Sequence, residues 1–253
     1  MHDKTVWIGL TILAIVLSGG YANTPETHKV DDMDACRMKQ ALEMNVELDY
    51  LLYLPEKNPG SGQKWPLMLF LHGAGERGDD LGLVKRNGPP KLIAEGKAFP
   101  FIIASPQCPK DISWSNPEKI IALNALIDQL VANHPIDESR IYLTGLSMGG
   151  FGTWSLAATY PDRFAAIAPV CGGGNRMEAR RLSEMPIWVF HGAKDKVVPI
   201  SMSQEMVDAL KKKGSDVKFT IYPETGHNSW VEAYNNPELY EWFLSHVKNR
   251  DGE

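Results

Sequence analysis

The sequence predicts an α/β fold in one domain, with helices on both faces of a mostly parallel central sheet. Short apolar runs alternate along the chain with longer segments that have the spacing of amphipathic helices. Strands that are apolar throughout are typical of parallel sheets, because helices cover both of their faces. At 253 residues the chain is long enough for one large domain of this kind, and it contains no internal repeat.

The N-terminal segment is expected to lie outside this domain. Residues 1–22 contain an uncharged apolar run at 6–17 followed by small residues, which is the pattern of a signal peptide. The run is shorter than the roughly 20 residues of a membrane span, although an uncleaved anchor is the alternative. We therefore expect a secreted or periplasmic protein that does not contact the membrane after cleavage, with a flexible leader at residues 23–36 and the folded domain at 37–253.

Each expected strand is a short apolar or β-rich run that ends at a proline, a glycine or a polar turn. Residues 66–71 are the clearest example, because they are apolar throughout and a glycine-rich segment follows them. The expected strands are an edge strand from residue 37, then 46–54, 66–71, 101–105, 140–143, 165–170, 187–190 and 217–222.

The expected helices lie between these strands. In residues 117–133 the side chains of Ile120, Leu123, Ile127 and Leu130 form one apolar stripe at the helical period. The other helices are expected at 91–96, 151–160, 201–213 and 237–248.

Composition excludes several functional classes. The net charge is −5 and no cluster of Lys and Arg stands out, so no nucleic-acid partner is expected. No Cys or His spacing is typical of a structural metal site, and no metal is expected. The three cysteines are Cys36, Cys108 and Cys171. We expect buried or loop thiols rather than a disulfide, because Cys108 and Cys171 follow strands that should not be neighbours.

A Gly-x-Ser-x-Gly pattern between a strand and a helix is the strongest functional signal in the chain. It consists of Gly145-Leu146-Ser147-Met148-Gly149. In this setting the pattern is typical of a nucleophile elbow, in which a strained backbone lifts the serine hydroxyl above the edge of the sheet. Glycine is needed on either side, because a side chain there would collide with the turn. Ser147 is therefore expected to be a nucleophile.

Two further residues fit the partners that a nucleophilic serine requires. A histidine must take the proton of the serine, and a carboxylate must orient that histidine. In this kind of fold the acid and then the histidine follow the serine along the chain, each on a loop after a strand. Asp195 and His227 meet this condition. We expect Ser147, Asp195 and His227 to be catalytic, whereas His72 and His191 are expected to support loops.

Two main-chain N–H groups are expected to stabilise the oxyanion that forms when the serine attacks. One belongs to Met148, directly after the serine. The other is expected at Ala74, in a loop where Gly73 and Gly75 let the main chain approach closely. Gly75 is the alternative donor.

Several motifs together give the chain a resemblance to a known family. They lie at residues 71–78 (LHGAGERG), 105–109 (SPQCP), 145–152 (GLSMGGFG), 191–195 (HGAKD) and 226–230 (GHNSW). The chain resembles the carboxylesterases often labelled "predicted peptidase", which are related to feruloyl and acetylxylan esterases and to polyhydroxyalkanoate depolymerases. The resemblance covers nearly everything from Arg37 to the C-terminus.

The resemblance implies a single-domain α/β-hydrolase fold for the catalytic domain. The nucleophile, acid and base of the family fall on Ser147, Asp195 and His227, and its oxyanion donor falls on Ala74. The implied activity is that of a serine carboxylesterase that needs no cofactor. Its substrates would be small or polysaccharide-linked esters.

An open substrate site without a large lid or cap is expected, because the link at residues 171–186 is too short for a helical lid. Trp114 and Trp230 are expected to form walls of this site, since an aromatic face stacks on a sugar or a ferulate ring. A feruloyl or acetylxylan esterase and a polyester depolymerase are the more specific alternatives. A serine peptidase, a lipase and a non-catalytic binding module are the remaining ones.

Overall fold

The computed structural model describes residues 26–30, 33–37, 44–55 and 62–248 of the chain. The expected signal peptide lies outside these residues. The chain divides into two compact units, Met1–Met44 and Asn45–Glu253.

The first unit contains a pair of strands where the sequence predicted a flexible leader. Strand β1 (Glu26–Val30) pairs antiparallel with β2 (Met33–Arg37). Strand β1 is mostly polar and β2 mixes polar with apolar residues, so neither has the apolar run on which the strand prediction depends. The edge strand expected from residue 37 falls largely on residues 38–43, outside the described part.

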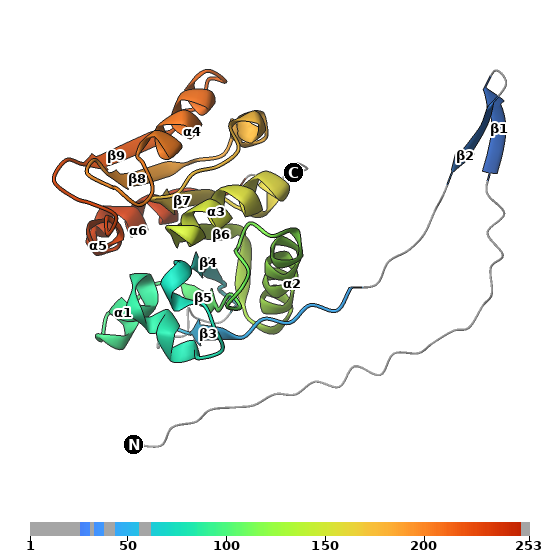
Figure 1. Cartoon of the computed structure of the whole chain (residues 1–253). Helices are drawn as coiled ribbons and strands as arrows, with labels where there is room; N and C mark the ends of the chain where they lie inside the picture. Colours follow the sequence, from blue (N-terminus) through green and yellow to red (C-terminus); the bar gives the residue numbers. More distant parts are fainter. Residues whose placement is uncertain (1–25, 31–32, 38–43, 56–61, 249–253) are drawn as a thin grey trace. The chain divides into compact units, whose positions relative to one another are not determined.

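The second unit is built on a seven-stranded sheet in the order β3-β5-β4-β6-β7-β8-β9 (Figure 1). Strand β3 is antiparallel to β5 at one edge, and the other neighbouring strands are parallel. The strands are β3 (Tyr50–Tyr53), β4 (Trp65–Leu71), β5 (Ile102–Pro106), β6 (Ile136–Leu146), β7 (Ala166–Val170), β8 (Trp188–Gly192) and β9 (Lys218–Tyr222). The predicted α/β class with a mostly parallel sheet is therefore confirmed.

Helices cover both faces of this sheet. They are α1 (Gly88–Ala94), α2 (Pro117–Asn133), α3 (Met148–Thr159), α4 (Ser201–Lys211), α5 (Trp230–Asn235) and α6 (Pro237–Leu244). Short 3₁₀ segments are η1 (Ala74–Glu76), η2 (Leu81–Arg86), η3 (Pro161–Arg163) and η4 (Arg176–Leu182).

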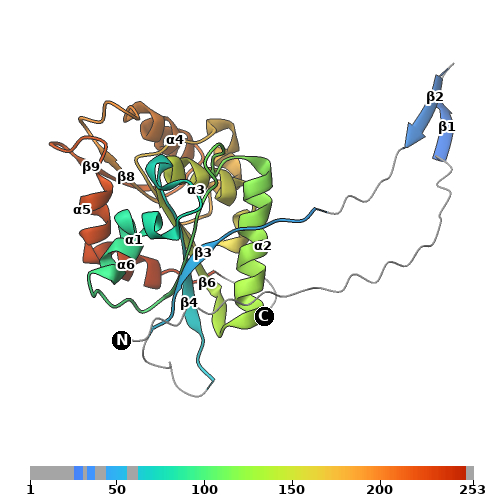
Figure 2. The same cartoon turned by 60° about the horizontal axis from the view of Figure 1, so that its bottom comes forward.

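Strand β4 shows how the two faces are divided. Leu67, Leu69 and Leu71 belong to an apolar cluster with side chains of α2, α3 and α4. Met68 and Phe70 belong to a second cluster with α5 and α6, against which α1 packs. Figure 2 shows α2 on one side of the sheet and α1, α5 and α6 on the other. Because successive side chains of a strand point to opposite faces, one apolar run fills both layers of the core.

Most element boundaries differ from the predicted ones by a few residues. Helix α2 spans the predicted residues 117–133, whereas α1 begins at Gly88 because Pro89 and Pro90 suit the first turn of a helix. The sequence did not predict α5, because six residues are too few to show helical periodicity.

Cys108 and Cys171 are buried free thiols. Burial raises the pKa of Cys108 to about 11 and that of Cys171 to about 12. They follow β5 and β7, which are not neighbours in the sheet, as the sequence predicted.

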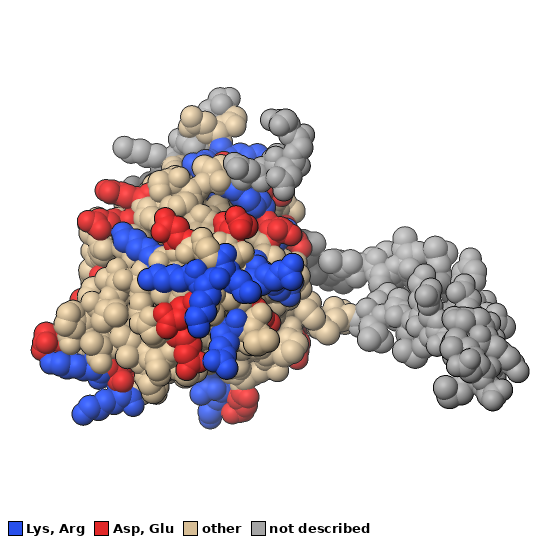
Figure 3. Space-filling view, turned by 90° about the horizontal axis from the view of Figure 1, so that it is seen from above, with Lys and Arg blue, Asp and Glu red and all other residues tan. Residues whose placement is uncertain are grey.

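The described part of the chain contains no helix with the length and apolar character needed to cross a membrane. The face shown in Figure 3 carries acidic and basic side chains together. This mixture agrees with a composition of 26 Lys and Arg against 31 Asp and Glu.

Candidate active site

Ser147 lies in the sharp turn between β6 and α3. Its backbone has φ 53° and ψ −116°, a combination that residues other than glycine rarely adopt. A Cβ atom on Gly145 would lie 2.4 Å from the main-chain oxygen of Gly149. One on Gly149 would lie 1.9 Å from the main-chain oxygen of Leu71. Only glycine fits at these two positions, which is the reason for the sequence pattern.

The structure brings Ser147, His227 and Asp195 together. Ser147 Oγ lies 2.9 Å from His227 Nε2, and His227 Nδ1 lies 2.7 Å from Asp195 Oδ2. The Asp195 side chain is fully buried, while that of His227 is 19% exposed. A carboxylate only accepts, so the neutral imidazole donates its proton from Nδ1. Its Nε2 is then free to accept the proton of the serine hydroxyl.

Asp195 is held by more than this histidine. Its Oδ1 accepts hydrogen bonds from the N–H groups of Val197 and Val198, at 2.8 and 2.9 Å. Burial raises the pKa of Asp195, but the hydrogen bonds from His227 and from these two N–H groups lower it by more. The net pKa lies below its ordinary value, so the carboxylate is charged at neutral pH and orients the imidazole.

A second histidine, His191, is fully buried and reaches the same carboxylate. His191 Nε2 lies 3.2 Å from Asp195 Oδ2 and 2.9 Å from the main-chain oxygen of Val198. Its Nδ1 lies 2.8 Å from Ser203 Oγ. Burial lowers the pKa of His191, which favours the neutral ring. His191 therefore supports the loop, as the sequence predicted. The sequence did not predict its contact with Asp195, because that contact depends on the path of the loop that follows β8.

The loop after β4 lies beside the serine. A Cβ atom on Gly73 would lie only 3.7 Å from Cβ of Ser147. Ala74 follows directly, starts η1 and is exposed, and its main-chain oxygen accepts a hydrogen bond from Arg77 Nε at 3.1 Å. Met148 is the first residue of α3, where main-chain N–H groups have no partner within the helix. Both expected oxyanion donors thus lie on segments that adjoin Ser147.

Trp114 is not a wall of the substrate site, and that expectation was wrong. Its side chain is fully buried, and its indole N–H donates to the main-chain oxygen of His72 at 3.0 Å. The two rings pack edge to face with their centroids 5.1 Å apart. The main-chain N–H of Cys108 donates to His72 Nε2 at 2.9 Å. This bond holds the start of the loop after β5 against His72, and Trp114 on the same loop is buried beside it.

Trp230 lies next to the expected base. Its ring meets the His227 ring edge to face, with the centroids 5.2 Å apart at an angle of 87°. Its indole N–H donates to Asn87 Oδ1 at 3.0 Å. The ring is partly exposed, so a contact with substrate stays a prediction.

An open pocket of about 350 Å³ adjoins the serine. It is lined by Ser113, Ser115, Ser147, Met148 and Phe151. A larger cavity of about 440 Å³ lies between η4 and α4, but its lining includes none of the three expected catalytic residues. Within the described residues, the link between β7 and β8 contains η4 and no longer helix that could form a lid there.

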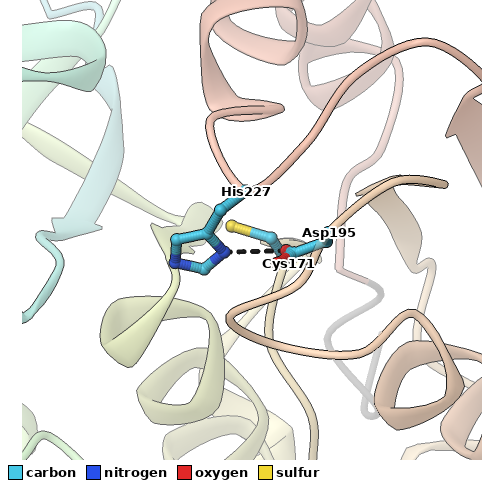
Figure 4. A group of neighbouring side chains, drawn as sticks. All are labelled: Cys171, Asp195 and His227. Atoms are coloured by element: carbon cyan, nitrogen blue, oxygen red, sulfur yellow. Dashed lines mark hydrogen bonds and ion pairs between the residues drawn. The ribbon is translucent and has the colours of Figure 1, made fainter.

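Cys171 lies beside Asp195 and His227 (Figure 4). Its Sγ and one ligand atom each of Asp195 and His227 lie within 4.8 Å of one another, a spacing that would suit a metal ion. However, the imidazole and the carboxylate are hydrogen-bonded to each other, and burial raises the pKa of the thiol to about 12. Both imidazole nitrogens are already hydrogen-bonded, to Asp195 and to Ser147, so a metal ion would have to displace one of these bonds and also the thiol proton of Cys171.

The fold and the site together define a class of protein. A mostly parallel sheet with a strained serine after β6, an aspartate after β8 and a histidine after β9 is the arrangement of an α/β-hydrolase. Residues 99–236, more than half of the chain, match the phospholipase/carboxylesterase family, and the chain belongs to this family. The resemblance to carboxylesterases that the motifs indicated is thereby confirmed.

Several known proteins are similar to this chain. Poly(3-hydroxyalkanoate) depolymerase C of Paucimonas lemoignei is 33% identical over 139 residues, which cover 50% of this chain and 31% of that protein. The bifunctional acetylxylan esterase/xylanase XynS20E of Neocallimastix patriciarum is 27% identical over 72% of this chain and 28% of that protein. A thermostable esterase of known structure has a TM-score of 0.71 and 34% identity, over 89% of this chain and 63% of its own. The chain thus spans less than a third of the length of these two curated relatives.

Proposed function

We propose that this chain is a serine carboxylesterase that forms an acyl-enzyme on Ser147. The observation that carries the proposal is the pair of hydrogen bonds from Ser147 Oγ to His227 Nε2 and from His227 Nδ1 to Asp195 Oδ2. His227 takes the serine proton while Oγ attacks the carbonyl carbon of the ester. The proton then passes to the alcohol oxygen, and the C–O bond of the ester breaks.

Water completes the reaction in a second attack. His227 takes a proton from the water as its oxygen attacks the acyl carbon, and then returns the proton to Ser147 Oγ as the carboxylic acid leaves. The negative charge on the carbonyl oxygen develops in both halves of the reaction. The main-chain N–H groups of Met148 and Ala74 are proposed to stabilise it, since both segments adjoin the serine.

The open pocket supports short-chain or carbohydrate- or aryl-linked esters as substrates. Its lining combines the hydroxyl groups of Ser113 and Ser115 with the apolar side chains of Met148 and Phe151. The names of similar proteins, an acetylxylan esterase, a polyhydroxyalkanoate depolymerase and a probable feruloyl esterase, support a feruloyl or acetylxylan esterase or a polyester depolymerase as the more specific possibilities. A lipase is less well supported, because the link between β7 and β8 lacks a helical lid. The pattern at residues 1–22 supports export to the periplasm or the medium.

A fluorophosphonate probe and the Ser147→Ala variant test the proposal. The probe should label the wild-type protein and not the variant. Loss of a triad serine should lower kcat by several orders of magnitude, on the order of 10⁶. Unlabelled wild-type protein would favour a non-catalytic binding module.

A panel of nitrophenyl esters, methyl ferulate and acetylxylan would then define the substrate. Because the pocket is open and small, acetyl to butyryl esters should be cleaved faster than decanoyl esters. A maximum at long acyl chains would contradict the short-chain assignment.

A further inference from the structure

Glu76 is a buried carboxylate that the proposed reaction does not use. It is 5% exposed and ends η1, the segment that begins with the expected oxyanion donor Ala74. Its Oε1 accepts a hydrogen bond from Asn87 Nδ2. Its Oε2 lies 3.9 Å from His72 Nδ1 and would be 3.2 Å from a Cβ atom on Gly73. Burying a carboxylate destabilises the folded protein unless the carboxylate is hydrogen-bonded, and the bond from Asn87 offsets this cost.

Asn87 joins this carboxylate to Trp230. Its Nδ2 donates to Glu76, and its Oδ1 accepts from the indole N–H of Trp230 at 3.0 Å. A carboxylate only accepts and an indole N–H only donates, so the amide satisfies both partners in one orientation alone. Asn87 also stands at the N-cap of α1, where asparagine usually caps the helix, but its side chain makes no capping bond. The amide therefore serves the contact with Trp230 and not its own helix.

Trp230 in turn contacts the proposed base. It is the first residue of α5, three positions after His227, and the two rings meet edge to face at 87°. Two hydrogen bonds and one ring contact thus connect Glu76 to His227 through Asn87 and Trp230. Asn87 and Trp230 are 143 positions apart in the sequence. The connection therefore links the loop of the oxyanion donor to the loop of the base.

We propose that Glu76 and Asn87 are positioning residues for the proposed ester hydrolysis. They hold the Trp230 ring in one place, and its contact with the His227 ring keeps His227 at hydrogen-bond distance from Ser147. The inference rests on the proposed function for its effect on the rate. A displacement of a catalytic group by about 1 Å can cost 10²-fold in rate, so loss of this support should lower kcat rather than raise KM.

A pair of substitutions tests the connection. Asn87→Asp places a second carboxylate against Glu76, so that two acceptors face each other, while the indole N–H keeps an acceptor. We expect kcat for nitrophenyl acetate to fall about 10- to 100-fold with little change in KM. Adding Glu76→Gln supplies an N–H that donates to the introduced carboxylate. The double variant should recover kcat to within about threefold of the wild type, which a general loss of stability would not allow.

Asn235→Asp is the matched control. It makes the same change on α5, at an exposed side chain whose amide donates a hydrogen bond to the main-chain oxygen of Val231. Its kcat should equal that of the wild type. Asn87→Leu is a second variant, which removes both hydrogen bonds without adding charge. It should also lower kcat, and it tests the inference if Asn87→Asp does not fold.

A measurement independent of activity separates this inference from the proposed function. In a ¹⁵N NMR spectrum, the indole N–H signal of Trp230 is the one lost in Trp230→Phe. It should shift in Asn87→Leu, and the ring signals of His227 should move in Asn87→Asp and return in the double variant. If the wild type cleaves no ester but these shifts occur, the proposed function is wrong and the connection stands. If both Asn87 variants keep wild-type kcat and leave the His227 signals unchanged, the inference is wrong.

Discussion

The indole N–H of Trp114 donates a hydrogen bond to the main-chain oxygen of His72, the residue that directly precedes the glycine-rich loop beside Ser147. This bond connects the loop after β5 to the end of β4 in the fully buried interior. Trp114 thereby stabilises the segment that carries the expected oxyanion donor, and it has no exposed surface for substrate.

Trp114→Phe should therefore affect stability and not substrate binding. The change removes the donor from a buried carbonyl oxygen, which typically costs about 1–3 kcal/mol. Urea unfolding should show this loss, while KM for aryl and sugar esters stays at the wild-type value. A raised KM with unchanged stability would return Trp114 to the substrate site.

Gly149→Ala should be strongly destabilising, because the new Cβ atom would lie 1.9 Å from the main-chain oxygen of Leu71. Overpacking of this kind typically costs about 1–3 kcal/mol, and a clash with main chain is at the upper end. Gly75→Ala is the control for stability, since a Cβ atom there meets nothing within 4 Å. Equal unfolding midpoints for the two variants would show that the elbow tolerates a side chain.

Asp195→Asn should leave the protein folded but slow it greatly. The amide can donate to His227 Nδ1, which places the imidazole proton on Nε2, where it faces Ser147 and blocks proton transfer. The loss of kcat should be about 10⁴-fold. Asp208→Asn, on α4, is the control and should keep wild-type kcat. Near-normal turnover in Asp195→Asn would assign the acid to another residue.

The stability of the protein should fall as the pH falls below about 6.5. Burial lowers the pKa of both His72 and His191 in the folded protein. In the unfolded chain these groups titrate near the ordinary value of about 6.5. On acidification the unfolded chain therefore binds protons that the folded protein does not, and the free energy of unfolding decreases.

Urea unfolding at a series of pH values between 7.5 and 5 would measure this slope, which is at most about 1.4 kcal/mol per pH unit for each histidine. His72→Gln removes one titrating group and should flatten the slope, whatever its effect on absolute stability. An identical slope in wild type and variant would mean that His72 titrates alike in both states.

The sequence by itself determined the sheet and the turn at Ser147. Apolar runs such as residues 66–71 form strands whose side chains fill both layers of the core. A strand buried on both faces needs apolar residues at consecutive positions, so it can be recognised in the sequence. The glycines at 145 and 149 are equally local, since the tight turn leaves no room for a side chain. The sequence also predicted that Ser147, Asp195 and His227 lie at one edge of the sheet, because each of them follows a strand.

Only the tertiary structure decided what the tryptophans do. An indole suits a buried core, a hydrogen bond or a sugar face, so its chemistry does not select among them. Trp114 is buried and Trp230 contacts His227 because of the paths of loops whose partners lie far along the chain. For the same physical reason, the sequence did not predict that His191 contacts Asp195, or that Asn87 contacts Glu76 and Trp230. A hydrogen bond between distant residues leaves no periodic pattern in the sequence, since it depends on where the packed core places the two loops.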